Sequence, residues 1–350
     1  MIVLEILGII VGFGFLIFIH ELGHFIAAKM CKVKVLAFAL GFGPDIVKAK
    51  HNGTKYAIKA FPLGGFVLMA GENPKEAKGE IGEYLSLIWY KKIFIAFLGP
   101  FCNYLLAIIL FAFIFNICGT STISNSSKIG DVLKNCPAEY AGLVPGDKII
   151  SIDGKSVNTW DDLSENLKSK ADRETYFVIE RGSYSFNVNM LVSKNPVTGT
   201  GVIGITPYVI YEAANFFKSV YLGSKLVIVH TVMTVKYLYN KIVSFEKLEL
   251  SGPIGIMSIM ADATKSGIDE YLKLLGIISV ALGLFNLFPI PMVDGGMIVL
   301  FFIEGIIKKQ ISTKVVQIYN TIGLLFILLI FIFATYSDLL RLGIGKLFGK

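Results

Sequence analysis

The stretch from Val3 to Ala28 reads VLEILGIIVGFGFLIFIHELGHFIAA, and its length and apolar character suit a membrane-spanning helix. Its only ionisable residues are Glu5, His20, Glu21 and His24. Ionisable side chains at membrane depth are costly, about 2.5 kcal/mol or more for a central charge, and they usually mark a functional site. The alternative is a chance match to the short HExxH pattern, which is more often found on a solvated helix face. The apolar surroundings argue against that alternative.

The HELGH segment has the spacing of a zinc hydrolase site. On a helix, His20 and His24 are four residues apart, so both imidazoles project from one face and can share one Zn²⁺. Glu21 lies beside them, where it can take a proton from an attacking water. The segment therefore predicts a hydrolase that works within the membrane, with His20 and His24 as metal ligands and Glu21 as the catalytic base.

Composition also indicates a membrane protein. The 350 residues are 54% hydrophobic and only 17% charged, and the mean hydropathy is +0.66. The net charge of +7 fits contact with anionic membrane lipid, and no nucleic-acid-binding pattern occurs, so nucleic acid is not expected as a partner. The four cysteines have no CxxC spacing, which gives no sign of a zinc-thiolate site or a disulfide framework. We predict about four transmembrane helices, in residues 1–30, 93–118, 251–306 and 315–342.

The distribution of lysines sets the expected topology. The region from Lys29 to Lys92 carries 11 lysines and five acidic residues, and three more lysines precede the last span. Positive loops stay on the cytoplasmic side, so both regions should be cytoplasmic. The start of the chain lacks the basic region and cleavage site of a signal peptide, so the first helix is expected to be retained. We expect a multi-pass protein of the bacterial cytoplasmic (inner) membrane.

Residues 119–210 are polar and rich in turns, and we expect them on the extracytoplasmic side. Their centre, residues 141–154, reads AGLVPGDKIISIDG, in which Asp153-Gly154 predicts a hairpin turn. Residues 158–168 predict a helix with Thr159 as N-cap, and residues 175–179 and 185–191 predict a pair of strands. The run resembles the core of a PDZ domain. Two roles remain open for it: a peptide-binding site, or a steric cap over the membrane site.

The lysines that recur through the apolar residues 216–235 predict an amphipathic interfacial helix within residues 211–250. This helix either shapes the outer gate or only anchors the chain to the membrane.

A catalytic zinc needs a third protein ligand. His51 and His230 lie in loop or amphipathic segments and are expected to be ordinary histidines. Asp294 is a better candidate because Pro289 and Pro291 break an apolar segment before it, and irregular backbone at membrane depth lines a cavity or is buried in protein. The two glycines that follow would let the backbone approach a metal closely. The alternative is that Asp294 simply caps the helix that restarts there.

Together, these motifs resemble the site-2 protease family of intramembrane zinc metalloproteases, in particular the bacterial regulator of sigma-E protease type. The resemblance rests on HELGH, on NLFPIPMVDGG at residues 286–296 and on the PDZ-like insertion between them. It extends to FPLGGFV at residues 61–67, which is similar to the family's membrane-associated β-loop, to Gly99-Pro100 with Asn103, and to residues 250–254 before the third span. It implies that His20, His24 and Asp294 bind Zn²⁺, that Glu21 is the base, and that Asn286, Gly64 and Gly65 contact substrate. Larger members have two PDZ domains, whereas this chain has room for one.

The expected fold class is therefore a membrane α-helical protein with an inserted PDZ-like β-rich domain and a membrane-associated β-loop in residues 31–92. The expected function is cleavage of the transmembrane segments of single-span membrane proteins, such as anti-sigma factors. Clearance of remnant signal peptides and a non-enzymatic scaffold or zinc carrier are the alternatives. Residues 56–69 either supply a strand edge that binds unwound substrate or form a plain hairpin.

Overall fold

Two compact units make up the chain. The computed structural model describes residues 2–73, 75–196, 198–244 and 252–341. One unit, here the helical unit, combines residues 1–116 with residues 215–350. The other, the inserted unit, comprises Ile117–Ala214. Each unit has its own hydrophobic core.

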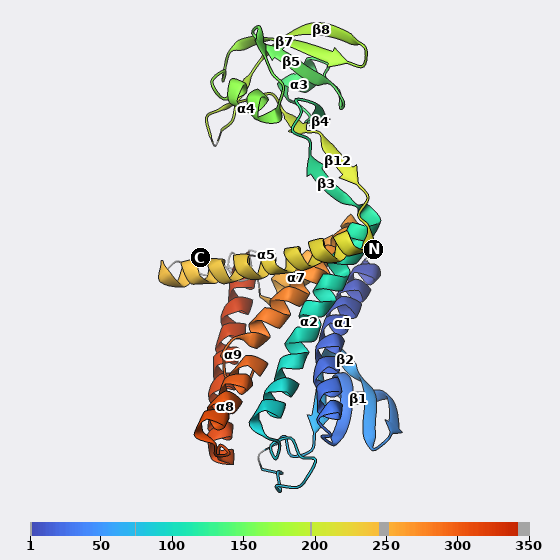
Figure 1. The fold of residues 1–350 in the computed structure, drawn as a ribbon, viewed down its shortest axis with the longest axis vertical. Helices are drawn as coiled ribbons and strands as arrows, with labels where there is room; N and C mark the ends of the chain where they lie inside the picture. Colours follow the sequence, from blue (N-terminus) through green and yellow to red (C-terminus); the bar gives the residue numbers. More distant parts are fainter. Residues whose placement is uncertain (1, 74, 197, 245–251, 342–350) are drawn as a thin grey trace. The chain divides into compact units, whose positions relative to one another are not determined.

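Long apolar helices lie side by side in the helical unit (Figure 1). Within the described residues, three of them are long and apolar enough to cross a membrane. These are α1 (Ile2–Met30), α2 (Trp89–Cys118) and α9 (Thr313–Arg341). Buried side chains of α1, α2, α6 (Pro253–Ser266) and α7 (Ile268–Leu287) form one core cluster, so these helices pack directly against one another.

The predicted span 251–306 is not a single interrupted helix. It consists of α6, α7 and α8 (Asp294–Ile307). Gly267 separates the first two because its φ of +129° is not available to other residues without strain. The segment that contains Pro289 and Pro291 separates α7 from α8, as predicted. Two residues of the motif that resembles the entry to this span, 250 and 251, lie outside the described residues.

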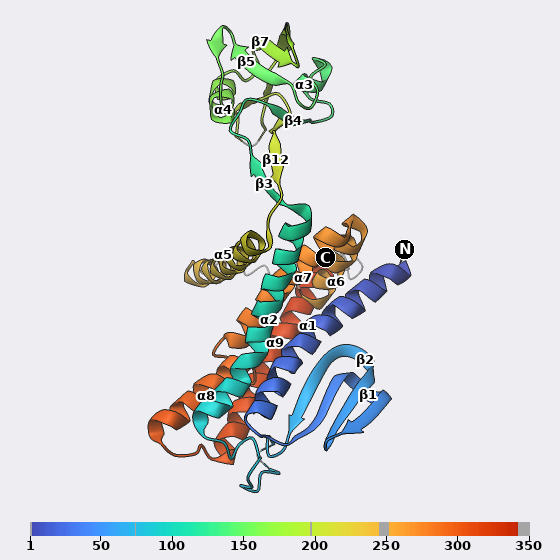
Figure 2. The ribbon, with the colours of Figure 1, turned by 45° about the vertical axis from the view of Figure 1, so that its right-hand side comes forward.

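A long curled hairpin follows α1, formed by β1 (Val35–His51) and β2 (Thr54–Met69) (Figure 2). Its first strand lies inside a sheet that folds back on itself, because Ala39 is flanked by Ala57 on one side and by Phe66 on the other. The segment from Gly65 to Met69 is therefore an edge, with β1 as its only strand partner within the described residues. Hydrophobic residues of the hairpin pack against α1 and α2.

The amphipathic helix lies within the predicted range 211–250. It forms α5 (Phe216–Val243), and residues 245–250 of the predicted range lie outside the described residues. The predicted boundary at residue 211 falls inside β12 (Val209–Glu212), because this strand pairs with β3 (Thr120–Ile123). The buried face of α5 packs on α2, where a Cβ on Gly223 would lie 2.9 Å from the Ala112 nitrogen and the Ile108 oxygen.

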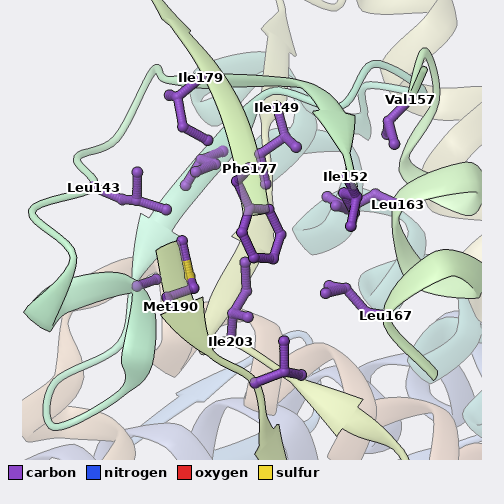
Figure 3. Packing of buried hydrophobic residues seen from close by; sticks show 13 residues of the cluster. Leu143, Ile149, Ile152, Val157, Leu163, Leu167, Phe177, Ile179, Met190 and Ile203 are labelled. Atoms are coloured by element: carbon purple, nitrogen blue, oxygen red, sulfur yellow. The ribbon is translucent and has the colours of Figure 1, made fainter. Parts of the chain in front are cut away.

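The inserted unit is a small β-rich domain built around Phe177. A four-stranded sheet in the order β6-β5-β7-β8 carries the ring, and buried residues such as Ile149, Met190 and Ile203 surround it (Figure 3). Short strand pairs and two helices complete the unit. Between β3 and β12, the elements of this unit are, in chain order, β4 (Ile129–Val132), α3 (Pro137–Tyr140), β5 (Lys148–Ile152), β6 (Lys155–Ser156), α4 (Trp160–Lys168), β7 (Glu174–Arg181), β8 (Tyr184–Leu191), β9 (Ser193–Lys194), β10 (Gly201–Val202) and β11 (Ile205–Pro207).

Local sequence signals in the inserted unit are confirmed. Asp153 and Gly154 form the tight turn between β5 and β6, with φ values of +50° and +80°. Thr159 is the N-cap of α4, and its side chain and that of Asp162 form a capping box. The predicted strands at 175–179 and 185–191 lie within β7 and β8, which pair in register.

Candidate metal centre and active site

Helix α1 positions the two histidines and the glutamate. His20 is 8% exposed, and its Nε2 lies 3.2 Å from Nε2 of His24 one turn later. The close approach of α2 to this part of α1 depends on small residues, because a Cβ on Gly23 would lie 2.3 Å from the Leu98 oxygen. The short distance between the two Nε2 atoms confirms that both imidazoles project from one face of α1, as predicted.

The third candidate ligand comes from the break between α7 and α8. Asp294 is the first residue of α8, and the N-cap position belongs to Val293, which makes no side-chain capping bond. The Asp294 carboxylate contacts both histidines, so the alternative that it merely caps the helix does not hold. The two glycines after it admit backbone carbonyls: a Cβ on Gly295 would lie 2.3 Å from the Leu287 oxygen, and one on Gly296 would lie 1.9 Å from the Ile290 oxygen. Both glycines are therefore needed for the close packing of the break, and their approach to a metal stays a prediction.

The three donor atoms are spaced for one zinc ion. Oδ2 of Asp294 lies 3.1 Å from Nε2 of His20, and Oδ1 lies 3.4 Å from Nε2 of His24. One ligand atom from each of the three residues can be chosen so that all lie within 4.8 Å of one another. A tetrahedral Zn²⁺ with bonds of about 2.0–2.1 Å keeps its ligand atoms about 3.3–3.4 Å apart. Among the described residues, these three are the only group with such an arrangement of possible ligands. Two histidines, one carboxylate and this spacing fit a zinc site with an open fourth position.

Helix α2 contacts the other ring nitrogen of each histidine. Nδ1 of His24 lies 2.8 Å from the Ile95 carbonyl oxygen, and Nδ1 of His20 lies 3.1 Å from the side-chain amide of Asn103. Gly99 lies between these contacts, where a Cβ would be 2.3 Å from Nε2 of His24. The sequence motif Gly99-Pro100 with Asn103 therefore lies against the metal site. Its spacing alone gave no role to the individual residues.

A cavity of about 510 Å³ opens in front of the three ligands. Glu21 lines it, as do Asn286 and Gly65, two of the residues that the resemblance implied in substrate binding. Gly64 does not line this cavity. It has a φ of +122° and lies against Phe42. The lining residues that sequence reasoning missed include Glu72, Tyr84 and Asn320.

The two remaining histidines lie away from the metal centre. His51 is at the tip of the β1–β2 hairpin opposite Thr54, and His230 stacks on Phe111 at a centroid distance of 6.0 Å. Their expected status as ordinary histidines agrees with these positions.

A known protein family matches the part of the chain that contains these site residues. The sequence model of peptidase family M50 matches residues 8–330, which include α1 with its histidines and the break with Asp294. The chain belongs to peptidase family M50. Family M50 is the site-2 protease family that the sequence motifs resemble, so that resemblance is confirmed. The M50 protein is a zinc metalloprotease.

Relatives over the full length agree. A protein of Clostridium acetobutylicum is 32% identical over 94% of this chain and 95% of its own length, and one of Campylobacter jejuni is 30% identical over 97% and 94%. Their names class both as zinc metalloproteases. Among solved structures, the PDZ domain of the SdrC-like protein of Listeria monocytogenes matches 25% of the M50 chain and 90% of its own, with 22% identity and a TM-score of 0.22.

The inserted unit of the M50 protein has a cavity of its own. Its volume is about 340 Å³, and α4 and the segment from Gly201 to Ile205 line it. The two walls meet at one point, because a Cβ on Gly201 would lie 2.2 Å from the Leu167 oxygen.

Proposed function

We propose that this M50 protein is an intramembrane endopeptidase that cuts the transmembrane segments of single-span proteins in the bacterial cytoplasmic membrane. One observation supports the proposal above all. Glu21 and the three possible zinc ligands line the same cavity, and this cavity lies among long apolar helices. A site placed among such helices suits a peptide bond that lies in the bilayer. Anti-sigma factors are the proposed type of regulated substrate.

The residues around the cavity have different roles in the proposed reaction. His20, His24 and Asp294 would hold Zn²⁺, which when bound supplies a Lewis acid and makes water nucleophilic near neutral pH. Glu21 takes the proton of the attacking water and delivers it to the leaving amine. The Asn286 side-chain amide lines the same cavity and would hold a polar group of the substrate backbone.

A substrate helix must unwind before its carbonyl can be attacked, and we propose that the β2 edge binds the unwound segment. Gly65, Phe66 and Val67 line the cavity, and this edge has no strand partner other than β1 in the described residues. A Cβ on Gly65 would lie 3.1 Å from Cγ of Glu21, so the edge lies directly beside the base. Addition of a substrate strand here would bring its backbone to the metal centre.

Cross-linking tests this arrangement on exposed positions of one hairpin. Leu68, 43% exposed, lies between the cavity-lining residues Val67 and Met69, and Val47, 59% exposed, lies on the opposite edge of the same sheet. Each is replaced by cysteine in a chain that carries Glu21→Gln and lacks its native cysteines, and the substrate carries a cysteine near the cleavage position. We expect a disulfide with Leu68→Cys and little with Val47→Cys. Equal yields from both positions would contradict binding at the β2 edge.

The membrane arrangement is also part of the proposal. The lysine-rich region between α1 and α2 supports a cytoplasmic position for the β-hairpin, and the inserted unit would then be extracytoplasmic. The inserted unit would bind a peptide in its groove or restrict access to the membrane site. The α5 helix would lie in the membrane interface, since its length and lysines suit contact with lipid head groups.

Glu21→Gln tests the enzymatic assignment. A general base contributes about 10²–10⁴-fold to rate, so the variant should lose that much turnover of a reconstituted transmembrane substrate. Its zinc content should equal that of the parent, because Glu21 is not a ligand. Equal turnover by variant and parent would favour the non-enzymatic scaffold or zinc carrier. Cleavage of remnant signal peptides but not of intact single-span proteins would favour the clearance role.

Asp294→Ala tests the third ligand independently of turnover. Removal of one of three protein ligands should lower the zinc content of the purified protein, measured by atomic emission after dialysis against a weak chelator. Asp269→Ala is the matched control, because its carboxylate is about half exposed on α7 and belongs to a surface ion pair. Full zinc occupancy in Asp294→Ala would remove this residue from the ligand set.

A further inference from the structure

Asn103 is buried next to the metal site with one polar atom unsatisfied. The residue is 0% exposed on α2, and its Nδ2 lies 3.1 Å from Nδ1 of His20. Its Oδ1 is also buried and has no hydrogen-bond partner among the described residues. The contact with His20 is thus the one side-chain hydrogen bond that this buried amide makes among the described residues.

Metal binding decides which atom of the amide His20 needs. A histidine that binds a metal through Nε2 keeps its proton on Nδ1, and that N–H then requires an acceptor. The amide nitrogen cannot accept, whereas the amide oxygen can. A half-turn about the last side-chain bond exchanges the two atoms at nearly unchanged positions. The contact of 3.1 Å then joins the Nδ1–H donor of His20 to Oδ1 of Asn103.

We propose that Asn103 is a positioning residue for the zinc site, accepting the Nδ1–H of His20 through its side-chain oxygen. The inference rests on zinc binding by His20. In this arrangement, α2 provides a hydrogen-bond acceptor for Nδ1–H of both histidines. His24 already meets the Ile95 carbonyl oxygen at 2.8 Å through its own Nδ1. Each ligand would thus have its tautomer and ring orientation fixed by one acceptor on α2.

The backbone of Asn103 is itself held in place. The buried hydroxyl of Ser279 on α7 donates to the Asn103 carbonyl oxygen at 2.8 Å. The close contact of Gly23 with the Leu98 oxygen fixes the separation of α1 and α2 nearby. A short side chain on a fixed backbone has few ways to leave its histidine, which suits an orienting role.

Two substitutions separate an acceptor from a donor. Asn103→Leu has a similar shape and no acceptor, so zinc affinity should fall about 10–100-fold, the usual cost of losing such a partner. Asn103→Asp can only accept, so its zinc affinity should stay within about threefold of the parent. Affinity is measured on the full chain in detergent by competition with a fluorescent zinc chelator. Asn166→Leu, the same replacement on α4 of the inserted unit, is the matched control and should leave zinc affinity unchanged.

The outcomes are distinguishable from misfolding and from failure of the zinc site. Thermal unfolding of each metal-free variant reports its fold, and zinc binding by the parent in the same assay tests the site itself. Unchanged zinc affinity in Asn103→Leu overturns the inference, and so does an Asp variant that folds but binds as weakly as the Leu variant.

A measurement without any substitution at Asn103 stands beside these variants. Spectra of ¹⁵N-labelled histidine in the zinc-loaded parent should show the His20 proton on Nδ1. A proton on Nε2 would contradict zinc binding through that atom and, with it, the proposal that depends on this binding.

Discussion

Gly99 shows how strongly a single position controls the metal centre. It lies on α2 against the imidazole of His24, and an added Cβ would be 2.3 Å from Nε2, the atom that would bind the metal. Helix backbone on one side and the ring on the other leave no free space at this point. Relief of the overlap requires the His24 ring to leave the position in which its Nε2 lies 3.2 Å from Nε2 of His20.

Gly99→Ala should therefore weaken zinc binding by at least about tenfold, because a displaced ligand costs no less than a lost outer partner. Alanine favours a helix over glycine by about 1 kcal/mol, so helix stability alone predicts no loss. Gly14→Ala on α1 is the matched control, since the nearest atom to its Cβ would be 4.0 Å away. Chelator competition compares the two, and equal zinc affinity in both would contradict the steric argument.

At the scale of elements, a buried ion pair joins α2 to α8. Nζ of Lys92 lies 2.8 Å from the Glu304 carboxylate, and the two side chains are 1% and 8% exposed. Lys92 also lies over the Phe301 ring, 5.2 Å from its centroid. The pair connects the helix that contacts both histidines to the helix that begins with Asp294. It therefore fixes the spacing of the elements that assemble the site.

Lys92→Met should destabilise the protein by about 3–5 kcal/mol, because it leaves the Glu304 carboxylate buried without a partner. Replacement of both residues by apolar ones should restore most of the loss. Lys273→Met removes the cation of an exposed pair with Glu270 and should cost no more than about 1 kcal/mol. Denaturant unfolding in detergent gives the free energies. A Lys92 variant as stable as the Lys273 variant would show that the pair is not structurally important.

At the scale of the whole molecule, the inserted unit has its own core and its own response to pH. The Thr159 side chain and the amides of the capping box lower the pKa of Asp162, and Lys170 lowers the pKa of Asp153. Carboxyl groups with a lowered pKa in the folded state stabilise it while they are ionised. This stabilisation is complete above about pH 5 and is lost as the pH falls below the unfolded value of about 3.9 toward the folded one.

The free energy of unfolding of the inserted unit should fall as the pH drops below about 5, and Asp162→Asn should flatten that fall. The chain has two tryptophans, so Trp89→Phe leaves Trp160 of α4 as the fluorescent reporter of this unit. Asp161→Asn is the control, because it removes the same charge from the same helical turn outside the capping box. Identical pH curves for Asp161→Asn and Asp162→Asn would contradict the assignment to the capping box.

Local patterns determined much of this molecule from the sequence. Helix periodicity alone placed His20 and His24 on one face, with Glu21 beside them. The capping box of α4 and the Asp153-Gly154 turn likewise depend on neighbours in the chain. Asp294 was identifiable because a lone acid beside two prolines is unusual in an apolar segment. These features rely on interactions within a few residues, which a sequence displays directly.

Only the tertiary structure decided which distant groups complete the site. The contacts of Asn103 and Ile95 with the histidines span 83 and 71 residues, and the Lys92–Glu304 pair spans 212. The same packing turned the residues after Asp294 against backbone carbonyls and divided the predicted third span into α6, α7 and α8. Such contacts depend on how close two helices approach. That distance is set by side-chain volumes on both surfaces at once, and no single segment of sequence contains it.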